Sequence, residues 1–122
     1  IDSVISSVDW TLQGSLENLT LTGTTAVRCN GNSVANLLTG NATGNTIDAG
    51  AGNDTVSGGA GNDTITGGLG NDSLTGGVGS DVFRFTTTSG SDTIRRLNTL
   101  MVEKRGAKRN ATVEMLSVEW II

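Results

Sequence analysis

The chain has 122 residues and a formal net charge of −4, and it contains 18 glycines, one cysteine, no histidine and no proline. The lack of histidine excludes a Ser-His-Asp or Cys-His catalytic centre and a His-ligated zinc site, and a single cysteine excludes an intramolecular disulfide and a thiolate cluster. No apolar run reaches the roughly 18 residues that a membrane-spanning helix needs, and the first residues do not have the pattern of a cleaved signal peptide.

Residues 1–30 are predicted to form the first strands, or an N-terminal cap, of a larger β-structure. Residues 8–12 and 17–23 alternate apolar and polar side chains, which is the pattern of half-buried strands. The apolar residues expected on one side are Val8, Trp10, Leu12, Leu19 and Leu21. Val27 or Cys29 would continue the inward-facing series.

Nine-residue units follow one another over residues 31–84 and define a region that we assign to residues 31–93. With position 1 placed at Gly58, the clearest units read GGAGNDTIT, GGLGNDSLT and GGVGSDVFR. The unit before them, AGAGNDTVS, keeps the same pattern from position 2 onward. The two earliest units, GNSVANLLT and GNATGNTID, carry Asn36 and Asn45 at position 6 in place of Asp. A fixed short period of this kind is the signature of a repeat architecture.

Position 8 of every unit is apolar and its neighbours are mostly polar, which predicts a three-residue strand whose middle side chain points inward. These apolar residues are Leu38, Ile47, Val56, Ile65, Leu74 and Phe83. The glycines at positions 1, 2 and 4 are expected to give the backbone freedom, including positive φ, that tight turns need. Alternating turns and short strands predict an all-β fold in which the chain winds as a parallel coil.

Residues 94–122 differ from the rest in charge. Residues 1–93 carry nine acids and two bases, for a net charge of −7, whereas this tail carries three acids and six bases, for +3. Four apolar residues fit one face of a helix, namely Ile94, Leu97, Leu100 and Met101. The pattern of residues 113–122 fits a helix or a strand. The basic side chains could contact nucleic acid or an anionic membrane, but a solvated helix face is the preferred interpretation, so no nucleic-acid partner is expected.

The Asp at position 6 recurs every ninth residue, and this spacing predicts cation sites. If two units make one coil, Asp54 pairs with Asp72 and Asp63 pairs with Asp81 on the edges of the coil. Coils about 4.8 Å apart bring these carboxylates close enough to repel one another. Calcium takes about six to eight oxygen ligands at about 2.3–2.6 Å, so an ion between coils fits the spacing, and carbonyls of the turns would complete its shell. Asn45 opposite Asp63 would form a weaker third site.

Without a cation, the repeats have the composition of a disordered chain, because they are rich in glycine and acid and poor in large apolar side chains. The whole sequence contains two Phe, two Trp and no Tyr, so a conventional core would be thin. Calcium-binding free energy would then be folding free energy. We expect folding where calcium reaches about 10⁻⁴–10⁻³ M, the range of extracellular modules.

The pattern GGxGxDxUx, in which U is a large apolar residue, resembles the calcium-binding nonapeptide of RTX (repeats-in-toxin) proteins. Units 58–66, 67–75 and 76–84 match it at every defined position. The stretch LENLTLTG at residues 16–23 resembles the segment that precedes such repeats in large bacterial adhesins and secreted enzymes. The resemblance extends over roughly residues 3–93.

This resemblance implies a right-handed parallel β-roll with calcium ions between its turns. The carboxylate ligands would be Asp54, Asp63, Asp72 and Asp81. The carbonyl ligands would come from Gly50, Gly52, Gly59, Gly61, Gly67, Leu69, Gly76 and Val78. The resemblance further implies export from a Gram-negative bacterium by a type I secretion apparatus, and a secreted or cell-surface protein that folds outside the cell.

These observations favour a non-catalytic calcium-binding module that supports the secretion and stability of a larger exported protein, and we expect a monomer. Two alternatives stay open, which are the C-terminal part of a secreted metalloprotease or lipase and an adhesin repeat. Neither HExxH nor GxSxG occurs in the sequence, so the catalytic residues of such an enzyme would lie outside this chain. The final residues, EWII, resemble the end of some type I secretion signals, and foreign sequence after residue 94 is the other interpretation of the tail.

Overall fold

The computed structural model describes residues 1–25, 27–85, 92–95, 100–104, 112–114 and 118–121. All regular structure in these residues is β-strand, and they include no helix long and apolar enough to cross a membrane. The first strands are β1 (Ser3–Ser6), β2 (Trp10–Thr11), β3 (Asn18–Leu21) and β4 (Arg28–Asn30). The next are β5 (Leu37–Thr39), β6 (Thr46–Asp48), β7 (Thr55–Ser57), β8 (Thr64–Thr66), β9 (Ser73–Thr75) and β10 (Asp81–Phe85). The last are β11 (Thr93–Arg95), β12 (Leu100–Lys104), β13 (Thr112–Glu114) and β14 (Val118–Ile121).

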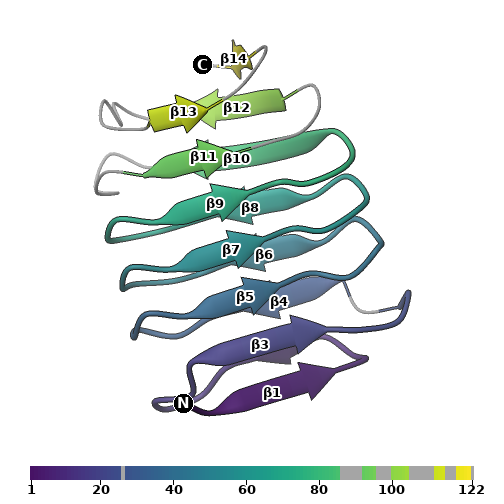
Figure 1. Ribbon diagram of the computed structural model, residues 1–122, viewed down its shortest axis with the longest axis vertical. Helices are drawn as coiled ribbons and strands as arrows, with labels where there is room; N and C mark the ends of the chain where they lie inside the picture. Colours follow the sequence, from purple (N-terminus) through teal and green to yellow (C-terminus); the bar gives the residue numbers. More distant parts are fainter. Residues whose placement is uncertain (26, 86–91, 96–99, 105–111, 115–117, 122) are drawn as a thin grey trace.

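The strands form two seven-stranded parallel sheets. The odd-numbered strands, from β1 to β13, make one sheet in chain order, and the even-numbered strands, from β2 to β14, make the other. The chain therefore crosses from one sheet to the other after every strand, and two strands make one coil (Figure 1). The coils stack in sequence order, with β1 and β14 at opposite ends. The predicted all-β fold, a parallel β-roll, is confirmed.

Adjacent coils of the repeats are in register at an interval of eighteen residues, as two units per coil predict. Val56 pairs with Leu74 in one sheet, and Ile47 pairs with Ile65 in the other. Side chains alternate between the two faces of a strand, so the middle residue of each short strand points into the roll. Its polar neighbours in β7 are exposed or half-buried.

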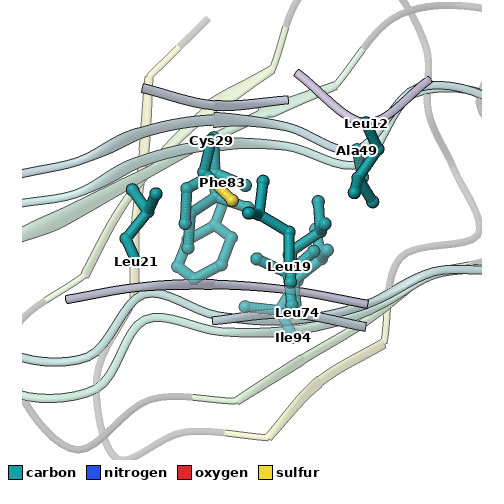
Figure 2. Close-up of a cluster of buried hydrophobic side chains, with 12 residues drawn as sticks. Leu12, Leu19, Leu21, Cys29, Ala49, Leu74, Phe83 and Ile94 are labelled. Atoms are coloured by element: carbon teal, nitrogen blue, oxygen red, sulfur yellow. The ribbon is translucent and has the colours of Figure 1, made fainter. Parts of the chain in front are cut away.

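One column of apolar side chains from each sheet fills the interior, and every member is at most 1 % exposed. The odd-numbered strands contribute Leu19, Leu38, Val56, Leu74 and Ile94. The even-numbered strands contribute Cys29, Ile47, Ile65 and Phe83. Figure 2 shows Cys29 and Phe83 projecting from one side of this narrow core, with Leu19, Leu74 and Ile94 on the other. All six residues predicted at position 8 are therefore core residues.

Five apolar residues of the N-terminal strands were predicted to lie on one side and face inward. The prediction is right for three of them and wrong for two. The buried residues are Leu12, Leu19 and Leu21. Val8 lies in a bend before β2 and is 58 % exposed, and Trp10 is 42 % exposed. Trp10 is in register with buried Cys29, but β2 is the edge strand of its sheet, and none of the described strands pairs with its outer side. Cys29 continues the inward column, whereas Val27 is exposed.

In the tail, the structure has strands where the sequence favoured a helical face. Ile94 belongs to β11 and pairs with Val113, and Leu100 and Met101 belong to β12, which pairs with β10. Parallel pairing with the preceding coil supplies the backbone hydrogen bonds and overrides the helical spacing of the apolar residues. The predicted helical face is therefore wrong at these positions, and Leu97 lies outside the described residues.

Candidate metal centre

The turn between β8 and β9 shows two separate reasons for glycine in the repeat. Gly68 and Gly70 have φ values of +84° and +103°, which side-chained residues rarely adopt. Gly67 does not have a positive φ, but a Cβ at this residue would meet Oδ2 of Asp72. Positions 2 and 4 therefore allow the turn, and position 1 leaves room for the carboxylate. The expected positive φ is thus found at positions 2 and 4 and not at position 1, where one unit carries Ala49.

The carboxylate at position 6 bonds to the backbone of the coil before it. Along one edge of the roll, the N–H of Asp54 donates to Oδ1 of Asp72, and the N–H of Asp72 donates to Oδ1 of Asp92, each at 2.9 Å. Along the other edge, the N–H of Asp63 donates to Oδ1 of Asp81 at 2.9 Å. The predicted pairing of Asp54 with Asp72 and of Asp63 with Asp81 is therefore observed.

These carboxylates are buried, and burial changes their proton affinity. The exposed fractions of Asp54, Asp63 and Asp81 are each 1 %. Burial raises the pKa of Asp54 to about 6, against the lowering effect of the hydrogen bond that its carboxylate accepts from the N–H of Asn36. Burial, together with the nearby charge of Asp81, raises the pKa of Asp63 to about 7, against the lowering effect of the hydrogen bond from the N–H of Asn45. The pKa of Asp81 is also raised by burial. Each group therefore favours a proton, or another positive charge, beside it.

Two carboxylate oxygens lack a partner in the part of the chain that the structure describes. Oδ2 of Asp54 and Oδ2 of Asp63 are buried and accept no hydrogen bond there. Buried polar atoms in folded proteins nearly always have a partner, because an unpaired buried charge is costly. A cation would provide one. Among the described residues, nowhere do three or more Asp, Glu, His or Cys side chains gather, so the other ligands would be backbone carbonyls, which suit calcium.

Two pairs of predicted carbonyl ligands contact each other across coils. The carbonyl oxygens of Gly50 and Gly59 accept hydrogen bonds from the N–H groups of Leu69 and Val78, both at 3.1 Å. The side chains of Leu69 and Val78 are 50 % and 55 % exposed, so these turns form the surface of the roll. A carbonyl oxygen has two lone pairs, and one hydrogen bond leaves the second lone pair for a cation.

The other predicted carbonyl ligands lie in the same turns. The carbonyl oxygens of Gly52 and Gly61 lie against the position-4 glycines of the next coil. Gly67 and Gly76 lie against the position-6 carboxylates of their own units. All eight residues therefore belong to the turns that carry the buried Asp side chains.

The two turns with Asn at position 6 have a different internal bonding pattern. Oδ1 of Asn36 accepts a hydrogen bond from the N–H of Asn32, and Oδ1 of Asn45 accepts one from the N–H of Asn41, both at 2.9 Å. The oxygen of Asn45 thus already has a donor within its own turn, and the N–H of Asn45 donates to Oδ1 of Asp63 at 2.7 Å. A cation at the weaker third site expected here would have to share this oxygen with the N–H of Asn41.

Asp92 is a buried member of the edge that sequence reasoning missed. It is 1 % exposed and follows Asp72 by twenty residues, where the repeat would place it after eighteen. The sequence SDTI at residues 91–94 is similar to NDTI at residues 62–65, and this local match was the signal that could have identified it.

A second row of side chains, at position 5, also links the coils. Oδ1 of Asn53 accepts a hydrogen bond from the N–H of Asn71 at 2.8 Å, and Oδ1 of Asn62 accepts one from the N–H of Ser80 at 2.9 Å. The same interval of eighteen residues relates these pairs, so the period could have predicted them. They hold the outer rim of the turns in place next to the buried carboxylates.

Comparison with known protein families agrees with this geometry. The model of the RTX calcium-binding nonapeptide repeat, which has four copies, matches residues 30–65 and 50–83. No curated protein and no solved structure matches the chain. The matched residues include the paired carboxylates and the apolar columns of the repeats. Residues 30–83 of the chain therefore match the family of RTX calcium-binding nonapeptide repeats.

Proposed function

We propose that the chain is a calcium-binding module that folds on extracellular calcium and supports the secretion and stability of a larger exported protein. The observation that carries this proposal is the buried Oδ2 of Asp63, which has no hydrogen-bond donor among the described residues and lies one coil from the carboxylate of Asp81. Oδ2 of Asp54 is in the same situation one coil from Asp72. Calcium supplies the positive charge that these oxygens lack, and it tolerates an irregular shell of oxygen ligands.

Each proposed ion is held between coils by two carboxylates and by carbonyl oxygens of the two turns. The carboxylate pairs are Asp54 with Asp72 and Asp63 with Asp81. The carbonyl ligands are drawn from Gly50, Gly52, Gly59, Gly61, Gly67, Leu69, Gly76 and Val78. Because each pair joins turns eighteen residues apart, an ion bound there would fix one coil on the next.

Coupling between folding and calcium follows from the same residues. Each of the four repeats with Asp at position 6 buries one carboxylate and one large apolar side chain, such as Asp63 with Ile65 and Asp72 with Leu74. Neutralising these charges removes a penalty that the thin core does not offset. The resemblance to RTX proteins supports the further proposal that a type I apparatus exports the chain unfolded, at low cytosolic calcium, as part of a secreted or surface protein.

Calcium titration tests the central proposal. In excess chelator, the circular dichroism of the chain should show incomplete β-structure, and calcium should complete it with a midpoint of about 10⁻⁴–10⁻³ M. The double variant D63A/D72A removes one carboxylate from each edge, so calorimetry should show weaker binding at both proposed pairs. Complete β-structure in chelator, unchanged by millimolar calcium, would overturn the proposal. An unchanged number of bound ions in D63A/D72A would overturn the assignment of ligands.

Export is tested separately. The chain is fused to the C-terminus of a small reporter and expressed in bacteria with and without a type I secretion apparatus. The reporter should reach the medium only when the apparatus is present. Retention of the reporter in the cells that carry the apparatus would overturn the secretion part of the proposal and leave the calcium part to the titration.

A further inference from the structure

We infer that the residues at positions 2, 4 and 6 together decide whether a turn takes a calcium ion, and that the coils up to Asp48 are held without one. The inference rests on the proposed function, because it separates turns that bind calcium from turns that do not. It assigns to the segment of residues 3–48, here called the base, a role as a folded platform for the calcium-dependent coils.

The two kinds of turn differ in the donor that faces position 6. In the turns with Gly59 and Asp63, and with Gly50 and Asp54, the glycines have φ values of +92° and +90°. In both turns Oδ2 of the Asp is buried and accepts no hydrogen bond from the described residues. None of the described N–H groups of the turn donates to this oxygen, which leaves the oxygen for a cation.

In the Asn turns, the backbone itself provides that donor. The N–H of Asn32 donates to Oδ1 of Asn36, and the N–H of Asn41 donates to Oδ1 of Asn45, both at 2.9 Å. Among the described residues, only glycines have a positive φ. The φ of Asn32 and of Asn41 is therefore not positive, whereas the φ of the glycines at the same position is positive. The N–H at position 2 therefore occupies the role that a cation would have in an Asp turn.

The carboxamide nitrogens are also bonded, so the Asn turns bury no unpaired group at this position. Nδ2 of Asn36 donates to the carbonyl oxygens of Leu16 and Glu17, both at 3.1 Å. Nδ2 of Asn45 donates to Oδ1 of Asn41 at 3.0 Å. A neutral, fully bonded carboxamide does not carry the desolvation penalty of a buried carboxylate, so no cation is needed to stabilise these turns.

The base also has half of the buried apolar core and no buried acid. Its buried apolar side chains are Leu12, Leu19, Leu21, Cys29, Leu38 and Ile47. Val4 and Leu16 pack against this cluster. Its acidic residues, Asp9, Glu17 and Asp48, are exposed or half-buried. The coils that follow bury one large apolar side chain and one Asp per unit. The base therefore has as many buried apolar side chains as the rest of the described roll and a smaller electrostatic penalty.

Thiol labelling of the whole chain tests the calcium independence of the base. Cys29 is fully buried in β4, and burial raises the pKa of its thiol to about 12, so it reacts only when the base opens. The matched variant C29S/I65C moves the thiol to a fully buried position of the same column. In chelator, Cys29 should react at least about a hundredfold more slowly than in the urea-unfolded chain, whereas the thiol at position 65 should react at the unfolded rate. Calcium should protect both.

Equal, fast labelling of the two thiols in chelator would overturn the inference. Hydrogen exchange of the wild-type chain in chelator gives the same comparison without substitution. The amides of Leu38 and Ile47 should stay protected, and those of Ile65 and Leu74 should exchange freely. Loss of protection at all four positions would equally overturn the inference.

Converting an Asn turn into an Asp turn tests the role of the glycines at positions 2 and 4. The triple variant N41G/T43G/N45D should bind about one more calcium ion per chain than the wild type, measured by calorimetry or equilibrium dialysis. The single variant N45D should bind the wild-type number, because the N–H of Asn41 still donates to the new carboxylate. A gain by N45D alone, or no gain by N41G/T43G/N45D, would overturn the inference. Failure of the wild-type chain to bind calcium would overturn the proposed function instead.

Discussion

The backbone N–H of Asp63 donates a 2.9 Å hydrogen bond to Oδ1 of Asp81, one coil later, while Oδ2 of Asp63 has no donor among the described residues. One oxygen of a position-6 carboxylate thus holds the preceding coil, and the other is left for a cation. Substitution separates the two roles, because Asn keeps an acceptor and removes the charge, whereas Ala removes both.

We therefore predict different results for D81N and D81A. Both variants should raise the calcium midpoint by removing a charged ligand. At saturating calcium, D81A should be less stable than D81N by about 1–3 kcal/mol, the usual cost of leaving a buried N–H without its acceptor. Urea unfolding monitored by circular dichroism measures the difference. The exposed Asp2 provides the control D2N, which makes the same charge change. Equal stabilities of D81N and D81A would contradict the structural role of Oδ1.

Acidification should stabilise the calcium-free roll. The pKa of Asp54 is raised from 3.8 to about 6 and that of Asp63 from 3.8 to about 7 in the folded state. A raised pKa means that the folded chain binds the proton more tightly, so this stability is fully present below about pH 4 and is lost as the pH rises through 6 and 7. Each group contributes on the order of 3 kcal/mol at low pH, since one pKa unit corresponds to about 1.4 kcal/mol.

The measurement is urea unfolding in calcium-free buffer between pH 8 and pH 5. The midpoint should rise as the pH falls, and D63N, which removes one of the two groups, should show a smaller rise. The calcium midpoint should also rise on acidification, because protons and calcium compete for the same oxygens. A calcium-free roll that is most stable at pH 8 would contradict the burial of these carboxylates.

Features that depend only on the period were predictable from the sequence. If two nine-residue units make one coil, residues eighteen apart share an edge or a face, whatever the details of the turn. This spacing alone brings Asp63 to Asp81 and aligns Val56 with Leu74. Alternation within a short strand then decides which side chain is buried, so the apolar columns were predictable as well.

Features that depend on local backbone geometry or on chain ends were not predictable. Asp92 was missed because the coil that leads to it has twenty residues, which breaks the period. The bonding of Asn45 depends on a contact within its own turn, the hydrogen bond from the N–H of Asn41, about which the period says nothing. Trp10 lies in the predicted column, but its exposure depends on whether another coil covers it. In the tail, pairing with an existing sheet edge decided between strand and helix.

Two glycine substitutions should separate backbone strain from close packing. Gly14 has a φ of +62° and open space where a Cβ would lie, whereas Gly68 has a φ of +84° and a Cβ there would meet the carbonyl oxygen of Gly50. G14A should cost only the strain of a left-handed conformation, about 1–2 kcal/mol, and should leave the calcium midpoint unchanged. G68A should cost more and raise the calcium midpoint, because it pushes apart two turns that would share an ion. Equal losses of stability, measured by urea unfolding in calcium, would contradict this difference.

Asp92 should stabilise the edge of the roll that carries Asp54 and Asp72. Its Oδ1 accepts the N–H of Asp72 at 2.9 Å, and this contact fixes the turn that supplies one carboxylate of the proposed ion. D92A should therefore weaken calcium binding on that edge and spare the edge of Asp63 and Asp81. D92N should weaken it less, because the carboxamide oxygen still accepts the hydrogen bond. Calorimetry resolves the two outcomes, since the edges would then titrate at different calcium concentrations. Wild-type binding by D92A would mean that the coil is held in place by its strand pairing alone, through β9 and β11.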